Sequence, residues 1–215
     1  QTLHERNAYG LRLPKPTHPE LRQLRSRHAP SAQGHKTWNA TWLLADFLTH
    51  QNVPQGLRVL DAGCGWGLAG IFCARTFQAE LIAIDIDPQV FPYLELHAHL
   101  NEITIQTLEA PFDQIPPELL AQQDLIIGAD ICFRQNMVAP VHLLIEQALN
   151  AGAPRLLLAD PGRPSFKNLC TLCAESAGTH SLSWQIEEPL IDWPGKRPII
   201  TGQLLTAGDF TPPSS

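Results

Sequence analysis

The chain has 215 residues, a formal net charge of −6 and 44% hydrophobic residues, which suits one folded domain with a substantial core. The acidic balance argues against non-specific binding to nucleic acid, because such binding depends on cationic contacts to phosphates. No apolar stretch reaches the roughly 18 residues that a membrane span requires, so we expect neither nucleic acid nor a membrane as a partner.

The first 36 residues differ from the rest of the chain in charge. They hold seven basic and two acidic side chains, whereas residues 37–215 hold eight basic and nineteen acidic ones. We therefore expect a basic N-terminal arm over residues 1–36. It would either attract an acidic partner or remain a solvated or internally neutralised segment. The arm has no apolar core of the kind found in signal peptides, so we do not expect secretion.

Alternating strand-length and helix-length apolar segments predict a single α/β domain over residues 37–205. Helices are expected over 38–50, 68–77, 88–101, 139–149 and 165–177, and strands over 57–61, 81–85, 104–108, 124–129 and 155–159. Two more strands, 181–187 and 198–205, should pair antiparallel at one edge. The predicted fold is a Rossmann-like, doubly wound, mostly parallel sheet of seven strands with an antiparallel edge hairpin. A frayed C-terminal tail should follow over 206–215.

A glycine-rich turn follows the first predicted strand, in the segment VLDAGCGWG. Asp61 ends the strand, and Gly63, Gly65 and Gly67 allow the chain to bend sharply and a ligand to approach the backbone. The second strand ends in Asp85, 20 residues after Gly65. A strand, a glycine turn, a helix and a second strand tipped by an acid predict a nucleotide-binding half of the sheet. Asp85 is expected to accept hydrogen bonds from ribose hydroxyls.

The spacing of these glycines indicates which cofactor the turn binds. A dinucleotide fingerprint requires a third glycine at the sixth position, where this chain has Leu68. Asp61 would repel a pyrophosphate, but it suits a ligand with an ammonium group and a sulfonium centre, bound directly or through water. The predicted cofactor is therefore S-adenosylmethionine, which leaves as S-adenosylhomocysteine; a nicotinamide dinucleotide is the alternative.

Each of the first five predicted strands ends in, or beside, an acidic residue, and the carboxyl ends of these strands share one edge of the sheet. The acidic residues are Asp61, Asp85, Glu109, Asp130 and Asp160. Glu109, or a nearby backbone amide, is expected to reach the adenine amino group. Asp130 either caps the following turn or orients an amine nucleophile beside the methyl donor, with Phe133 as a wall of the pocket.

The fifth strand is followed by the sequence ADPGR, where Pro161 and Gly162 predict a turn. Arg163 is expected either to hold a carboxylate of the substrate or to pair with an acidic strand end of its own sheet. The motif Asp/Asn-Pro-Pro-Tyr/Phe, expected of enzymes that methylate exocyclic amines of bases or glutamine, does not occur in the sequence. A nucleobase substrate is therefore less favoured.

The chain contains five cysteines, an odd number that argues against a full disulfide framework and for reduced thiols in the cytoplasm. Cys170 and Cys173 form a C-x-x-C sequence, but no second pair of cysteines or histidines follows at zinc-ligand spacing. We expect a buried helical pair here, and no metal site.

Four features together resemble the class I (seven-β-strand) S-adenosylmethionine-dependent methyltransferases: Trp38, the VLDAGCGWG segment, Asp130-x-x-Phe133 and the DPGR sequence ending at Arg163. Within that class they resemble the protein-lysine methyltransferases, and above all the group that modifies the β subunit of electron transfer flavoprotein, with its bacterial relatives. The resemblance extends from about residue 34 to residue 163 and implies that Asp130 and Phe133 border a lysine channel. Asp160 and Arg163 are expected on the substrate side. The expected cofactor contacts are Trp38, Asp61, Gly63, Cys64, Gly65, Gly67, Asp85, Ile86, Glu109 and Ala129.

Two departures from that family pattern leave the substrate open. Position 133 holds Phe instead of the commoner Tyr, and Arg134 and Gln135 follow where an acid is frequent. The predicted reaction is an in-line SN2 methyl transfer to an amine, with a lysine of a protein as first choice and Asp130 orienting the amine. A partner of acidic character fits the basic arm. A small-molecule N- or S-methyltransferase and a non-catalytic S-adenosylmethionine-binding module are the alternatives, and the oligomeric state does not follow from the sequence.

Overall fold

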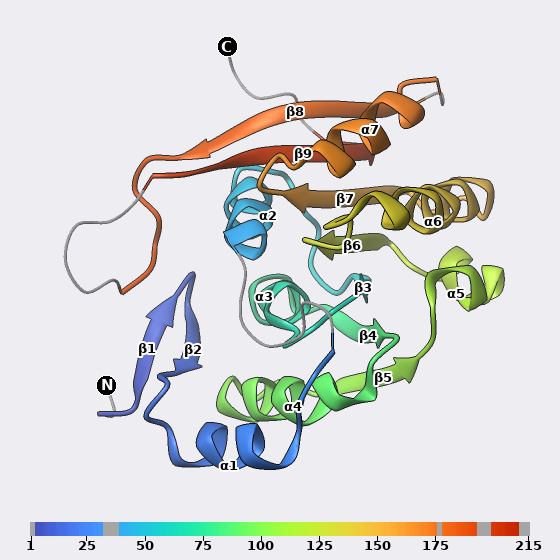
Figure 1. The fold of residues 1–215 in the computed structure, drawn as a ribbon. Helices are drawn as coiled ribbons and strands as arrows, with labels where there is room; N and C mark the ends of the chain where they lie inside the picture. Colours follow the sequence, from blue (N-terminus) through green and yellow to red (C-terminus); the bar gives the residue numbers. More distant parts are fainter. Residues whose placement is uncertain (1–2, 32–38, 176–177, 193–198, 211–215) are drawn as a thin grey trace.

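The computed structural model describes residues 3–31, 39–175, 178–192 and 199–210, and its main feature is a sheet of seven strands (Figure 1). In space, the strands follow the order β5-β4-β3-β6-β7-β9-β8. Their bounds are β3 Arg58–Ala62, β4 Glu80–Asp85, β5 Ile105–Glu109, β6 Leu125–Ala129, β7 Arg155–Asp160, β8 Thr179–Ile186 and β9 Ile200–Gly208. All neighbours from β5 to β7 are parallel, whereas β9 pairs antiparallel with both β7 and β8. The predicted doubly wound, mostly parallel sheet with an antiparallel edge hairpin is thus confirmed.

Helices cover both faces of this sheet (Figure 1). One face carries α2 (Asn39–Thr49), α3 (Leu68–Phe77) and α4 (Phe91–Leu100), and the other carries α5 (Pro117–Ala121), α6 (Val138–Asn150) and α7 (Pro164–Cys173). Successive side chains of a strand point to opposite faces, so Val59 packs into the core under the first group and Leu60 into the core under the second. None of the helices within the described ranges combines the length and the apolar character needed to cross a membrane.

The chain reverses its winding direction between β3 and β6, two parallel neighbours near the centre of the sheet. From β3 it proceeds through α3 to β4 and then to β5, whereas from β6 it proceeds in the opposite direction to β7. The loops that follow β3 and β6 diverge at this point, which opens a crevice at the carboxyl ends of the strands. A ligand site is therefore expected between the turn after β3 and the loop after β6.

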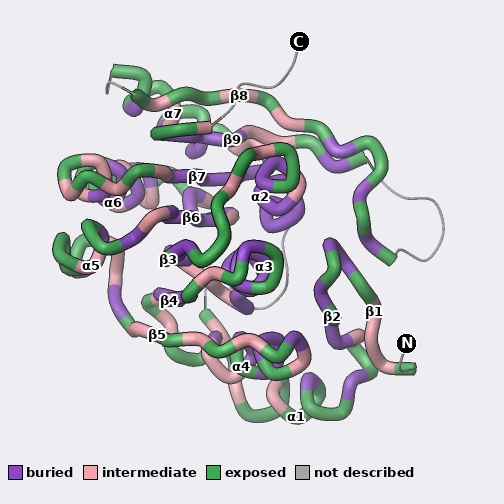
Figure 2. Tube along the Cα trace, turned by 180° about the vertical axis from the view of Figure 1, so that it is seen from behind, coloured by how far each residue is buried: buried purple, intermediate pink, exposed green. Residues whose placement is uncertain are grey.

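The N-terminal residues belong to the folded unit, beyond the boundary expected at residue 37. They form a hairpin of β1 (Glu5–Ala8) and β2 (Leu11–Pro14), followed by α1 (Pro19–Arg27), which packs against α4. Buried residues in β2 and α1 (Figure 2) attach this segment to the rest of the protein; they include Leu11, Leu13 and Leu21. Over its described residues, the expected basic arm is therefore a docked part of the structure.

The C-terminal boundary also differs from the expectation. β9 continues to Gly208, so the tail does not begin at residue 206; Thr206 and Ala207 are buried because they pair with β7. α7 ends at Cys173 instead of near residue 177. All five cysteines are free, and Cys170 and Cys173 both lie on α7, as expected, but of this pair Cys173 is buried and Cys170 is only partly buried.

Candidate active site

A cavity of about 550 Å³ opens at the carboxyl ends of β3, β4 and β6, at the point where the winding reverses. The segment that follows α1 also reaches it, through Ser31. Most of the predicted site residues line this cavity: Asp61, Gly63, Cys64, Gly65, Gly67, Asp85, Ile86, Ala129, Asp130 and Phe133. The structure therefore brings the predicted glycine turn and three of the acidic strand ends into one place.

The glycine turn after β3 has a backbone that other residues rarely adopt. Gly65 and Gly67 have φ angles of +52° and +73°. A Cβ atom on Gly67 would overlap Cδ1 of Leu94 on α4, whereas a Cβ atom on Gly65 would meet no atom of the described residues within 4 Å. Gly67 is thus required by packing, while Gly65 leaves open space at the cavity wall.

Asp85, at the end of β4, fixes the shape of this turn. Its carboxylate accepts hydrogen bonds from the N–H groups of Gly65 at 2.9 Å and Asp87 at 3.0 Å. Burial raises the pKa of Asp85, and the two N–H groups act in the opposite direction. A carboxylate has about four acceptor sites, so Asp85 keeps the capacity to bind hydroxyl groups of a ligand in the cavity.

Asp61, at the end of β3, is buried beneath the start of α3 and is only 1% exposed. One carboxylate oxygen accepts a hydrogen bond from the N–H of Gly70 at 2.9 Å. Burial raises the pKa of Asp61 to about 7, with the Gly70 N–H lowering it and the charge of Asp85 raising it. At neutral pH, Asp61 is thus close to the midpoint between its neutral and charged forms. A cationic group bound beside it would favour the charged form.

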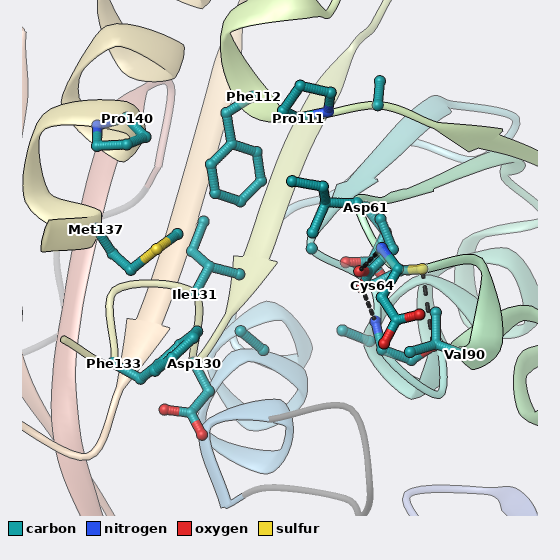
Figure 3. Close-up of a pocket in the computed structure, with 18 of the residues that line it drawn as sticks. Asp61, Cys64, Val90, Pro111, Phe112, Asp130, Ile131, Phe133, Met137 and Pro140 are labelled. Carbon is teal, nitrogen blue, oxygen red and sulfur yellow. Dashed lines mark hydrogen bonds between the residues drawn. The ribbon is translucent and has the colours of Figure 1, made fainter. Parts of the chain in front are cut away.

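An apolar wall lies across the cavity from these acidic strand ends (Figure 3). Phe112 comes from the loop after β5, Ile131 and Phe133 come from the loop after β6, and Met137 immediately precedes α6. Figure 3 shows the side chains of Phe112, Ile131 and Met137 pointing toward one another. Only Phe133 is predicted from the sequence. The other three belong to no recognised sequence motif. The sequence could indicate them only through their position beside a predicted strand end or helix start at the carboxyl edge of the sheet.

Asp130 and Arg163 form an ion pair at the edge of the cavity. Arg163 donates from both Nη atoms to the two carboxylate oxygens of Asp130. The carboxylate of Asp130 points away from Phe112 and Ile131 in Figure 3, and Asp130 has a φ angle of +66°, which is uncommon outside glycine. Asp130 thus borders the cavity while its charge is directed to Arg163.

Asp160 does not line the cavity, in contrast to the substrate contact expected of it. It is completely buried, and its carboxylate accepts hydrogen bonds from the N–H groups of Gly162 and Arg163, each at 2.8 Å. The guanidinium of Arg163 donates a further bond to it at 2.9 Å. Of the two roles expected for Arg163, the structure shows the pairing with acidic strand ends of its own sheet. Asp160 anchors the turn that positions Arg163.

Glu109 and Trp38 are the two predicted cofactor contacts that remain. Glu109 is exposed at the end of β5 and does not line the cavity, whereas the segment 110–113 that follows it does. Of the two groups expected to reach the adenine amino group, the Glu109 carboxylate or a nearby backbone amide, the Glu109 side chain lies outside the cavity lining and residues 110–113 lie within it. Trp38 lies outside the described residues.

Trp66, inside the glycine turn, lines the cavity without any motif that predicts it. Its ring is buried, stacks on Tyr93 of α4 with ring centroids 5.1 Å apart, and has the guanidinium carbon of Arg25 5.9 Å from its centre. Trp66 therefore packs the glycine turn against both α4 and the N-terminal helix α1.

The fold matches those of solved methyltransferases. The ribosomal protein L11 methylase from Lactobacillus delbrueckii subsp. bulgaricus is 17% identical, with a TM-score of 0.54 over 81% of this chain and 81% of that chain. A methyltransferase from Pyrococcus furiosus is 14% identical, with a TM-score of 0.51 over 76% of this chain and 81% of that chain. At these identities the similarity concerns the fold, which is that of the class I methyltransferases.

Sequence comparison narrows this class to a family. Residues 19–164 match the lysine methyltransferase family model, and the chain belongs to this family. It is 28% identical over 123 residues to the electron transfer flavoprotein β subunit lysine methyltransferase of Rattus norvegicus, covering 55% of this chain and 46% of the relative. It is 31% identical over 128 residues to the ribosomal protein L11 methyltransferase of Bordetella parapertussis, covering 55% and 38%. The chain thus spans about half the length of these relatives or less, and the predicted resemblance to protein-lysine methyltransferases is confirmed.

Proposed function

We propose that this protein transfers a methyl group from S-adenosylmethionine to the side-chain amine of a lysine in a protein substrate. The observation that carries the proposal is one cavity that combines the buried carboxylate of Asp61, a glycine turn held by Asp85 and an apolar wall beside Asp130. The first two suit a cofactor with an ammonium group and ribose hydroxyls. The apolar wall suits an amine that must be neutral to react, and membership of the lysine methyltransferase family supports the same conclusion.

The residues of the cavity fit S-adenosylmethionine. Asp61 would hold its ammonium group and Asp85 its ribose hydroxyls, while Gly65 leaves room at the turn because none of the residues that the structure describes fills the space beside it. The volume of about 550 Å³ lies within the range of about 300–1,000 Å³ that is typical of ligand pockets. When bound, the cofactor supplies a methyl group activated by a positively charged sulfur.

The apolar wall would prepare the lysine for reaction. A lysine amine attacks only when it is neutral, and its unperturbed pKa is about 10.4. Phe112, Ile131 and Met137 would exclude water from the amine, which disfavours the charged form and lowers its pKa, so that the proton leaves to solvent. Arg163 offsets the charge of Asp130, so Asp130 raises the lysine pKa less than an unpaired carboxylate would.

An acidic protein of the cytoplasm is the substrate that we favour. The two relatives described above are named for the β subunit of electron transfer flavoprotein and for ribosomal protein L11. α1 presents Arg22, Arg25 and Arg27 as exposed cations. Because Arg25 packs on a residue that lines the cavity, an acidic surface docked on α1 would bring its lysine close to the site. The five free cysteines support a reducing compartment.

Labelling of a cell extract with tritiated S-adenosylmethionine tests this function. Wild-type protein is compared with Asp61→Ala, and the labelled species are separated by size and identified by mass spectrometry. We expect wild type to label a protein on lysine and the variant to label nothing. Label in a small molecule would indicate a small-molecule methyltransferase. Absence of label, despite binding of S-adenosylmethionine in calorimetry, would indicate a binding module, and binding of NAD instead would indicate an oxidoreductase.

A further inference from the structure

A second cavity, of about 300 Å³, lies beside the candidate active site, between the β8–β9 hairpin and the start of α7. We call it the hairpin groove; it is lined by Gly162, Lys167, Ser183, Gln185, Thr201 and Gln203, among others. Asp130 borders the main cavity and Gly162 borders the groove. Arg163 binds Asp130 and directly follows Gly162, so the two cavities flank the same ion-paired cluster.

The hairpin groove exists because β8 and β9 project beyond the carboxyl end of β7 (Figure 1). β7 ends at Asp160, which lies opposite Gln203, whereas β8 and β9 remain paired as far as Ile186 and Ile200. The chain after β7 turns back into α7 at Pro164. One face of the projecting hairpin thus overhangs the start of α7, at the same edge of the sheet as the candidate active site.

Side-chain alternation makes this face of the hairpin polar. Trp184 also borders the groove, but its ring packs on the opposite face of the hairpin, against Phe47 of α2, with ring centroids 5.1 Å apart. Its neighbours Ser183 and Gln185 therefore lie on the groove side, as do their partners Gln203 and Thr201. Residues two apart in a strand repeat every ~6.6–6.8 Å, which is also the repeat of an extended peptide. Hydroxyl and amide side chains can both donate and accept hydrogen bonds, as the main chain of such a peptide requires.

Two groups of the groove lack partners within the described part of the chain. Oε1 of Gln203 is buried there without a hydrogen bond, and Lys167 takes part in none of the ion pairs among these residues. Lys167 is also the one charged side chain among the described residues that line the groove, in a protein with a net charge of −6. Buried polar atoms are normally satisfied, so the groove suits a ligand that supplies a hydrogen-bond donor and a negative charge.

We propose that the hairpin groove binds the segment of the substrate protein next to the target lysine, in an extended conformation and with an acidic side chain paired with Lys167. The proposal rests on the proposed function, since it assigns the groove to the same substrate. A segment bound there lies on the far side of the Asp130–Arg163 pair from the main cavity, so the chain can continue past this pair and place its lysine against the apolar wall. The enzyme would thereby select lysines that have an acidic residue nearby in the sequence.

The test uses the protein that wild type labels and a synthetic peptide copied from the sequence around its methylated lysine. KM and kcat for this peptide are compared among wild type, Lys167→Glu and Arg75→Glu. Arg75 is a control for the change of charge because it is exposed on α3 and lines neither cavity; its guanidinium also donates a hydrogen bond to the carbonyl of Asn101, which the substitution removes. We expect Lys167→Glu to raise KM about tenfold, equivalent to about 1.4 kcal/mol, with little change in kcat. Arg75→Glu should leave both constants unchanged.

Exchange of charges between enzyme and peptide makes the test specific. A peptide in which arginine replaces the acidic residue nearest the methylated lysine should be a poor substrate for wild type and a better one for Lys167→Glu. An unchanged KM in Lys167→Glu, an equal rise in Arg75→Glu, or failure of the exchange would overturn the groove assignment and leave the proposed function intact. If wild type methylates no protein, the proposed function fails and the groove assignment fails with it. Thermal denaturation checks that both variants are folded: each should unfold at the same temperature as wild type.

Discussion

Arg163 donates hydrogen bonds to both carboxylate oxygens of Asp130, although 33 residues separate the two in the chain. The same guanidinium binds Asp160 at the end of the neighbouring strand β7. The charge of Asp130 is therefore balanced within the protein before a substrate arrives, and its side chain is almost completely buried. Asp130 is thus a fixed part of the cavity edge, and a role in orientation suits it better than a role as a base.

Replacement of Arg163 by methionine should destabilise the protein by about 3 kcal/mol, because it leaves Asp130 buried without a counterion. Urea denaturation measures this loss. The double variant Asp130→Ala/Arg163→Met should recover part of it, since no unpaired carboxylate remains at that position. Lys167→Met, on an exposed side chain, is the control and should shift stability by less than about 0.5 kcal/mol. Equal stability of Arg163→Met and wild type would contradict the importance of the pair.

Asp130→Ala should abolish methylation of the protein substrate while binding of S-adenosylmethionine survives. The substitution removes the orienting carboxylate and releases the loop after β6, but it leaves Asp61 and Asp85 in place on the other side of the cavity. Transfer of tritium to the substrate measures the first effect, and calorimetry with the cofactor measures the second. Wild-type activity in this variant would exclude the role assigned to Asp130.

Binding of S-adenosylmethionine should strengthen about tenfold as the pH rises from about 5.5 to 7, because only the ionised fraction of Asp61 attracts the ammonium group. Burial raises the pKa of Asp61 to about 7, so this fraction increases over the whole interval. The ammonium itself remains protonated there, since an α-amino group has a pKa of about 7.7–8.0. Calorimetry at several pH values measures the trend. Asp61→Asn should bind more weakly and with a flat dependence over this range; a parallel rise in this variant would assign the effect to another group.

The same carboxyl group should make the ligand-free protein less stable as the pH rises. The pKa of Asp61 is about 7 when folded and about 3.9 when unfolded, so the folded state binds more protons between these values. The contribution of Asp61 is fully present below about pH 4 and is lost as the pH approaches and passes about 7. Urea denaturation at pH 5 and pH 7 should show a larger decrease for wild type than for Asp61→Asn. An equal decrease would mean that Asp61 titrates normally.

Alanine substitutions at Gly65 and Gly67 should have different effects, one mainly on cofactor binding and the other mainly on stability. Gly67→Ala combines a positive φ with overlap of Leu94 and should cost about 3 kcal/mol. Gly65→Ala has the strained φ without the overlap and should cost about 1 kcal/mol. Because Gly65 lines the cavity, its added methyl group should instead weaken binding of S-adenosylmethionine. Urea denaturation and calorimetry on both variants test this contrast, and the reverse order of stabilities would contradict it.

The cofactor side of the cavity is predictable from the sequence because it is built from one continuous strand–turn–helix–strand unit. Asp61, the glycines and Asp85 can therefore be recognised from their spacing in the sequence. The substrate side is assembled from loops that lie far apart in the chain. Arg163 reaches Asp130 only because β6 and β7 are neighbours. A local sequence pattern does not indicate which strand ends lie next to each other in the sheet. Phe112 and Met137 could not be predicted from the sequence for the same reason.

The secondary structure at the two ends of the chain could not be predicted from the sequence, because the burial of these residues depends on the distant segments that they pack against. In β2, the apolar pattern is limited to Leu11 and Leu13, separated by Arg12 and followed by Pro14, which is too short a run to indicate a strand. These side chains are buried because the hairpin and α1 dock on the rest of the protein. Thr206 and Ala207 likewise carry no strand signal of their own. Pairing with β7 buries them.

The β8–β9 hairpin is attached to the sheet along one side, through β9 alone, and its far end extends past β7. A change in the length or sequence of that end would leave β3, β4 and the glycine turn where they are. The residues proposed to bind the methyl donor are therefore separate from the surface proposed to bind the substrate protein. Under the proposed function, natural variation or deliberate engineering of this one hairpin would change the substrate while leaving the proposed cofactor site intact.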